Sequence, residues 1–212
     1  MPQSVNQRLA WIIAAMALIV FAFAGWLGGP GTPVDVKLIH ALAADRAVNP
    51  AATSVAIALT NVGGAAGMIA ILVAVLALLA FGRRWKQAAA FGGIVLGGRL
   101  VVESLKLLVD RPRPSFGPYP VGVSSLSFPS AHSANSMITF LAIALLVVPA
   151  RYRAVAVTAA VALSGVVGAT RPYLGVHWPS DVVGGWAFGV AWVVSLAIAS
   201  DYWRASRANR VV

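Results

Sequence analysis

The sequence predicts an all-α fold, an integral membrane bundle of six transmembrane helices. Its composition is apolar, with 59% hydrophobic residues, 10% charged residues and a mean hydropathy of +0.84. A soluble domain would carry about a quarter charged residues. Apolar runs of about 20 residues, the length that a helix needs to cross a bilayer, recur along the chain. We therefore expect one membrane domain over residues 1–212 and no second domain.

The apolar runs place the expected spans near residues 9–28, 57–81, 88–109, 131–149, 154–170 and 182–200. The first run is longer than the about 7–15 apolar residues of a signal peptide, so we expect a retained helix. Residues 30–53 interleave apolar and charged side chains, which predicts a short helix lying in the membrane interface. Residues 110–129 are rich in proline and glycine, which predicts a loop.

Basic residues indicate the orientation of these spans. Nine of them fall on one side of a six-span arrangement: Arg8, Arg83, Arg84, Lys86, Arg151, Arg153, Arg204, Arg207 and Arg210. The positive-inside rule makes that side cytoplasmic. We expect a multi-pass protein of the cell (inner or plasma) membrane with both termini in the cytoplasm. This bias also accounts for the net charge of +10 without a nucleic-acid partner.

Seven polar residues gather at the opposite, extracytoplasmic ends of the spans, in three short stretches. They are Lys106, Arg113, Ser130, His132, Arg171, His177 and Asp181. Ionisable side chains beside lipid are costly and usually serve a function. Because all seven lie at a similar depth, we expect them to form one site, and a pathway across the bilayer for a transporter is disfavoured.

The residue types in this site suit a phosphate group. Phosphoryl transfer is catalysed mainly by positioning and by stabilising negative charge, which Lys106, Arg113 and Arg171 can supply. Ser130 stands at the start of an expected helix, where its hydroxyl and free backbone N–H groups can bind an anion. Cysteine is absent and only six residues are acidic, so we expect neither a metal nor another cofactor.

The two histidines can divide the chemistry between them. His177 and Asp181 are four residues apart, and Pro179 between them is well placed to begin a helix. The Asp181 carboxylate could then accept a hydrogen bond from one ring nitrogen and leave the other free as a nucleophile. His132 remains to protonate the leaving oxygen and then to activate water.

At these residues the chain resembles the type 2 phosphatidic acid phosphatase superfamily of membrane lipid phosphatases. Its pattern is Lys-x6-Arg-Pro, then Pro-Ser-Gly-His, then Ser-Arg-x5-His-x3-Asp. The matching residues are Lys106, Arg113, Pro114, Pro129, Ser130, His132, Arg171, His177 and Asp181. Ala131 replaces the glycine and Thr170 replaces the serine, both conservative changes. The resemblance covers about residues 57–200, the core region that carries the three motifs.

The resemblance implies a six-helix core, a phosphohistidine intermediate on His177 and an acid and base role for His132. It implies phosphate binding by Lys106, Arg113, Ser130 and Arg171. The expected activity is metal-independent hydrolysis of a membrane lipid phosphate or diphosphate. Candidate substrates are undecaprenyl diphosphate, phosphatidic acid and phosphatidylglycerol phosphate.

Two other classes of protein have motifs of this kind. A lipid-linked phosphotransferase would pass the phosphoryl group to a lipid or sugar hydroxyl, and the motifs do not separate it from a phosphatase. Vanadate-dependent haloperoxidases have related motifs, but a membrane-embedded chain disfavours that class. The expected partners are the lipid phosphate substrate and membrane lipids, no nucleic-acid partner is expected, and the sequence predicts no oligomeric state.

The third expected span carries two further charges. Arg99, Glu103 and Lys106 lie at i, i+4 and i+7, on one face of a helix. An unpaired charge at the depth of Arg99 is costly. We therefore expect Glu103 to pair with Arg99 below the site, either as a structural ion pair or as a support that also holds Lys106 toward the phosphate.

Overall fold

The computed structural model describes residues 5–123 and 125–208, with side chains described for 7–123 and 125–199. Within these residues the chain is helical and contains no strand. The helices are α1 (Val5–Leu27), α2 (Pro33–Val48), α3 (Pro50–Gly63), α4 (Ala65–Phe81), α5 (Trp85–Val109), α6 (Ala131–Ala142), α7 (Arg153–Tyr173) and α8 (Pro179–Ala208). A π-helical turn, η1 (Ile143–Val147), continues α6, and a 3-10 turn, η2 (Ala150–Tyr152), precedes α7.

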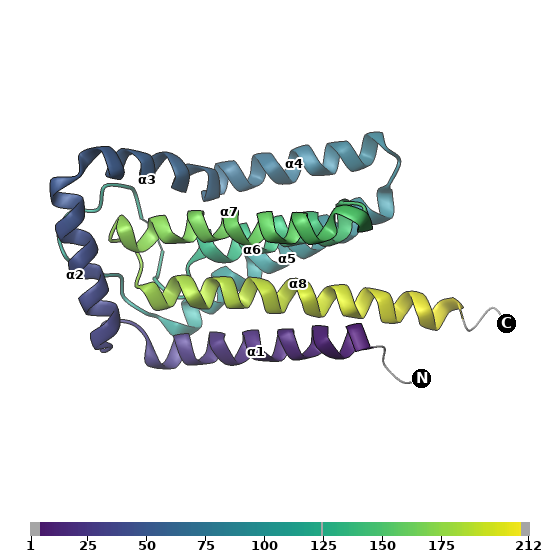
Figure 1. Ribbon diagram of the computed structural model, residues 1–212, viewed down its shortest axis with the longest axis horizontal. Helices are drawn as coiled ribbons and strands as arrows, with labels where there is room; N and C mark the ends of the chain where they lie inside the picture. Colours follow the sequence, from purple (N-terminus) through teal and green to yellow (C-terminus); the bar gives the residue numbers. More distant parts are fainter. Residues whose placement is uncertain (1–4, 124, 209–212) are drawn as a thin grey trace.

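The long helices run side by side, and α2 lies across one end of the bundle (Figure 1). Helix α1 begins and α8 ends at the opposite end, where the α4–α5 turn and the start of α7 also lie (Figure 1). Helix α6 is at the centre of the bundle, because it contacts α3, α4, α5, α7 and α8. The expected loop is confirmed in residues 110–123 and 125–129, which form no helix.

Four described helices are long and apolar enough to cross a membrane: Gln7–Leu27, Trp85–Val109, Ala150–Tyr173 and Pro179–Ala199. The pair α3 and α4 would add a fifth span if counted as one, although it bends by 43°. Ala131–Val147, where the fourth span was expected, is apolar but shorter. The all-helical membrane fold is therefore confirmed, and the count of six spans stays a prediction.

The second expected span differs from the structure at its start. Its helix begins at Pro50 rather than near residue 57, because Asn49 caps it by accepting a hydrogen bond from Ala52 N at 3.3 Å. Proline at the first helical position costs no hydrogen bond. The run is then broken at Gly64, between α3 and α4. The predicted interfacial helix over residues 30–53 is correspondingly shorter, since α2 ends at Val48.

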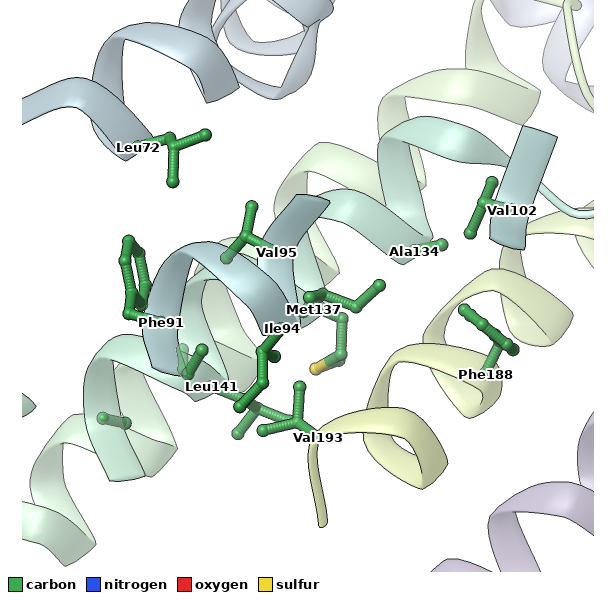
Figure 2. Packing of buried hydrophobic residues seen from close by; sticks show 14 of the residues in the cluster. Leu72, Phe91, Ile94, Val95, Val102, Ala134, Met137, Leu141, Phe188 and Val193 are labelled. Carbon is green, nitrogen blue, oxygen red and sulfur yellow. The ribbon is translucent and has the colours of Figure 1, made fainter. Parts of the chain in front are cut away.

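The apolar core lies between α4, α5, α6 and α8. Figure 2 shows members of this cluster from the four helices: Leu72 of α4, Val95 of α5, Met137 of α6 and Val193 of α8. Many large apolar side chains instead face outward, such as Phe81, which is 88% exposed. Apolar side chains can face lipid without cost, so they do not have to be buried inside the bundle. The interior can therefore hold the polar residues, whose hydrogen-bonding groups need partners within the protein.

Helices α6 and α8 approach closely at Gly185, which brings the start of α6 against the start of α8. A Cβ atom at Gly185 would lie 2.7 Å from the backbone oxygen of Ser130, so a side chain does not fit there. The backbone N–H of Ser130 donates to the backbone oxygen of Asp181 at 3.0 Å. The second and third motifs are thereby joined through the backbone.

Of the nine basic residues used to orient the spans, Arg210 and the side chains of Arg204 and Arg207 lie outside the described residues. The other six are exposed or lie at helix ends: Arg8, Arg83, Arg84, Lys86, Arg151 and Arg153.

Candidate active site

A polar pocket of about 340 Å³ opens among α3, α4, α5, α6, α7 and the loop that precedes α8. Five of the seven predicted site residues line it: Lys106, Arg113, His132, Arg171 and His177. Ser130 and Asp181 are 0% exposed and lie outside this lining. The pocket therefore brings together most of the residues that the motifs predicted, and the other two are buried.

Arg113 is held in place by three backbone oxygens of the loop residues around it. Its Nε donates to Ser125 O at 2.7 Å, and its Nη1 donates to Val176 O at 2.5 Å. Its Nη2 donates to Leu126 O at 3.3 Å. The guanidinium group is thus oriented before any phosphate arrives, which is the condition for strong electrostatic stabilisation.

Lys106 lies near the end of α5 and is 3% exposed. Its Nζ donates to Ser125 Oγ at 2.7 Å and lies 3.7 Å from Glu103 Oε2. Ser125 therefore connects the lysine to the loop that positions Arg113. The lysine keeps further N–H groups for a ligand, because an ammonium has three donors.

Arg171 stands in the last turn of α7 and is 3% exposed. Its Nη1 donates to Thr60 Oγ1 on α3 at 2.7 Å, but its buried Nε has no hydrogen-bond partner in the described part of the chain. A buried donor without a partner is costly. A phosphate oxygen in the pocket would supply that partner.

His177 is buried, and its two ring nitrogens have different neighbours. Arg113 Nη1 lies 3.0 Å from Nε2, and because a guanidinium only donates, Nε2 must be the accepting, unprotonated nitrogen. The proton then resides on Nδ1, which lies 3.4 Å from Asp181 Oδ2. This tautomer leaves a lone pair on Nε2, facing the group of cations, as a nucleophile requires.

The Asp181 carboxylate is fully buried and accepts several hydrogen bonds. Arg111 Nη1 donates to Oδ1 at 2.8 Å, while Trp178 N at 2.8 Å and Ser127 Oγ at 2.5 Å donate to Oδ2. The carboxylate is therefore paired and hydrogen-bonded, as a buried charge must be. It holds His177 in one orientation.

His132 and Ser130 have different surroundings. His132, in the first turn of α6, lines the pocket together with His177. The Ser130 hydroxyl instead accepts a hydrogen bond from Ser133 Oγ at 3.1 Å and is fully buried. The structure thus places His132 in the pocket and Ser130 behind it, and phosphate binding by Ser130 stays a prediction.

The expected ion pair between Arg99 and Glu103 is not formed among the described residues. Glu103 lies instead near Lys106, three residues along the same helix, with 47% of its side chain exposed. One helical turn separates the two, which is a favourable spacing for a charge pair. Arg99 and Glu103 both line the pocket.

Two residues of the site were missed by sequence analysis. Arg111 is 6% exposed, and besides Asp181 it donates to Ala24 O at 3.0 Å and to Gly25 O at 2.5 Å. Its neighbours Pro112, Arg113 and Pro114 read as a surface loop, so only Arg113 was assigned a role. Ser127 lies in a serine-rich loop without a recognisable motif, and only the fold brings it to Asp181.

No group of three or more His, Asp or Glu side chains in the described ranges is placed to hold a metal ion. The positive charges that line the pocket are the side chains of Arg99, Lys106, Arg113 and Arg171, and the last three belong to the predicted motifs. These can stabilise a phosphate in the way that a metal does elsewhere.

Comparisons with known proteins identify the family of this chain. The family model of the PAP2 superfamily matches residues 87–205. Phosphatidylglycerophosphatase B of Bacillus subtilis is 30% identical over 160 residues, which are 69% of this chain and 78% of that protein. A lipid A 1-phosphatase of Rhizobium johnstonii is 38% identical over 117 residues, 51% of this chain and 45% of that protein.

One solved structure shares the whole fold. The crystal structure of a transmembrane PAP2-type phosphatidylglycerolphosphate phosphatase from Bacillus subtilis superposes with a TM-score of 0.78 at 25% identity. The match covers 91% of this chain and 96% of that chain. The fold and the relatives define a multi-pass membrane phosphatase, a phosphoric ester hydrolase. The chain belongs to the PAP2 superfamily.

The surroundings of His177 predict its protonation state. Burial lowers the pKa of His177 to about 4, a shift that Asp181 opposes and Arg113 reinforces. A lowered pKa means that the neutral ring persists as the pH falls from 7 to 5 and is lost only near pH 4. In histidine-labelled protein in micelles, we expect the NMR signals of His177 to stay constant between pH 8 and pH 5.

The chain contains only three histidines, so His40→Asn and His132→Asn variants assign these signals. A titration of His177 with a midpoint near the ordinary histidine value of about 6.5 would contradict the inferred neutral nucleophile.

Proposed function

We propose that this chain hydrolyses a membrane lipid phosphate or diphosphate at the extracytoplasmic face, without a metal, through a phosphohistidine on His177. The observation that carries the proposal is the convergence of Lys106, Arg113 and Arg171 on one pocket with the unprotonated Nε2 of His177. Phosphoryl transfer requires positioned cations and an in-line nucleophile, and this pocket supplies both.

The proposed first step forms a bond between His177 Nε2 and phosphorus and breaks the bond from phosphorus to the leaving oxygen. The three cations bind the phosphate oxygens, and Arg113 turns from Nε2 to the phosphate. As positive charge develops on the ring, the Asp181 carboxylate stabilises it through Nδ1–H. His132 donates a proton to the leaving oxygen.

In the second step water hydrolyses the phosphohistidine. His132, now neutral, accepts a proton from the water, whose oxygen bonds to phosphorus while the bond to Nε2 breaks. Inorganic phosphate leaves, and both histidines return to their starting states. The names of the relatives support a lipid phosphate as substrate, since they are called phosphatases of phosphatidylglycerophosphate and lipid A.

The proposed membrane placement has six spans, with both termini in the cytoplasm of a cell whose inner or plasma membrane holds the protein. Helix α6 with η1 runs along the bundle axis among its neighbours, which supports its counting as a span despite its length (Figure 1). Arg83, Lys86 and Arg153 stand at the end away from α2, which supports a cytoplasmic location of that end (Figure 1).

Phosphate release from a panel of lipids tests the proposed activity. Purified protein should release phosphate from at least one of phosphatidic acid, phosphatidylglycerol phosphate and undecaprenyl diphosphate. This activity should survive EDTA and be inhibited by vanadate. His177→Asn should lower it by at least about 10⁴-fold, as expected when a nucleophile is removed.

The matched control is His40→Asn, because His40 is exposed on α2 and does not line the pocket. It should keep the parent rate. Robust turnover by a correctly folded His177→Asn protein would overturn the proposed nucleophile, and loss of activity in EDTA would overturn metal independence.

Cysteine labelling tests the proposed orientation, since the native chain contains no cysteine. In intact cells, an impermeant thiol reagent should modify Ser115→Cys in the loop before α6. It should not modify Lys86→Cys at the α4–α5 turn until the membrane is opened. Both positions are exposed, so burial does not explain a difference. The reverse pattern would show that the pocket faces the cytoplasm.

A further inference from the structure

Arg99 is a charged residue that has no role in the proposed reaction. It lies on α5, seven residues before Lys106, which places it about 10 Å farther from the helix end. It is half-buried and lines the same pocket. Among the described residues it has no carboxylate partner, because Glu103 pairs with Lys106. Such a charge within a membrane helix indicates a function.

The charges that line the pocket are unbalanced. Arg99, Lys106, Arg113 and Arg171 are opposed by Glu103 alone, so three positive charges remain. Asp181 does not offset them, because it is buried outside the lining and paired with Arg111. A terminal phosphate monoester carries at most about two negative charges at neutral pH. One positive charge is left over, and a second phosphate would neutralise it.

The surroundings of Arg99 also include an unsatisfied polar atom. Asn135 on α6 is 8% exposed, lines the pocket beside Arg99, and its Oδ1 has no hydrogen-bond partner in the described residues. The Oδ1 atom accepts a hydrogen bond, which the Arg99 guanidinium can donate while its other N–H groups face the pocket. The amide nitrogen of Asn135 is a second donor, so Arg99 and Asn135 together can offer N–H groups to a phosphate oxygen.

The lining becomes apolar on the far side of Arg99. A small cavity of about 20 Å³ shares Arg99 and Asn135 with the main pocket, and its other walls include Met68, Leu72 and Val95. Along α5 the order is thus Lys106 beside the catalytic group, then Arg99, then Val95 at an apolar wall. A lipid whose second phosphate lies between its terminal phosphate and its hydrocarbon chain has the same order.

We infer that Arg99, with Asn135, binds a second phosphate of the substrate, on the lipid side of the phosphate that is removed. This inference rests on the proposed function and narrows its substrate class to lipids that carry two phosphates. The second phosphate is either part of a diphosphate or a phosphodiester. Phosphatidic acid has one phosphate, so Arg99 makes no phosphate contact when this lipid is bound.

The test compares kcat/KM of the parent and of Arg99→Met on three lipids. With an undecaprenyl diphosphate or a phosphatidylglycerol phosphate substrate, the variant should lose about 10- to 100-fold, as expected for a hydrogen bond between charged groups. With phosphatidic acid it should stay within about twofold. The lipid that shows the loss identifies the source of the second phosphate, diphosphate or diester.

Arg153→Met is the matched control, since it removes an exposed arginine at the start of α7, far from the pocket along that helix. It should change no rate. An equal loss on all three lipids would mean that Arg99 has a structural role, and no loss on any lipid would mean that it binds no phosphate. Either result overturns the inference.

A binding measurement separates this inference from the proposed function. The parent protein should bind inorganic pyrophosphate about tenfold more tightly than inorganic phosphate, measured by calorimetry in micelles, and Arg99→Met should remove the difference. If no lipid is hydrolysed but this preference is found, the proposed function fails and the second site stands. If the parent shows no preference, the second site is overturned even when the variant does not fold.

Discussion

The buried carboxylate of Asp181 is the interaction on which the pocket depends. Its oxygens accept hydrogen bonds from the loop before α6, from the start of α8 and from Arg111, whose other donors bind the last turns of α1. Three segments distant in sequence, the end of α1, the loop between α5 and α6 and the start of α8, are therefore joined around one charge. Removing one partner of such a buried pair costs about 3–5 kcal/mol, because a charge is left uncompensated.

Helix α2 secures the same region from outside. Asp35 is 3% exposed and accepts from Ser180 N at 3.0 Å, so it satisfies a free N–H group of the first turn of α8. At the other end of α2, Arg46 Nη1 donates to Tyr173 O at 2.6 Å, at the end of α7. The two helices that carry Arg171 and Asp181 are thus held at their ends by one crossing helix, which Figure 1 shows at the end of the bundle.

Local chemistry made much of this structure predictable. The long apolar runs predicted that the chain is built from membrane helices. The motif residues Lys106, His132, Arg171 and His177 line one pocket, as their positions at helix ends predicted. The start of α3 was misplaced because Pro50 reads as a helix breaker unless its role at a first helical position is recognised. Span length alone also did not predict the bend at Gly64.

The residues that sequence reasoning missed act over long separations. Arg111 binds Asp181, which is 70 positions away, and only the packed fold makes that pair. Glu103 was assigned to Arg99 on helical spacing, yet Lys106 is equally close along the helix and lies near the pocket. Periodicity restricts which residues share a face, but tertiary packing decides which of them pair.

The most direct test of the account is to trap the phosphoenzyme. A lipid labelled on its terminal phosphate is mixed with enzyme, stopped in alkali and mapped by mass spectrometry. The account predicts phosphate on His177, a slower decay of this phosphohistidine in His132→Ala because water is then not activated, and no phosphate in His177→Asn. Turnover without a phosphorylated His177, or phosphate on another residue, would contradict it.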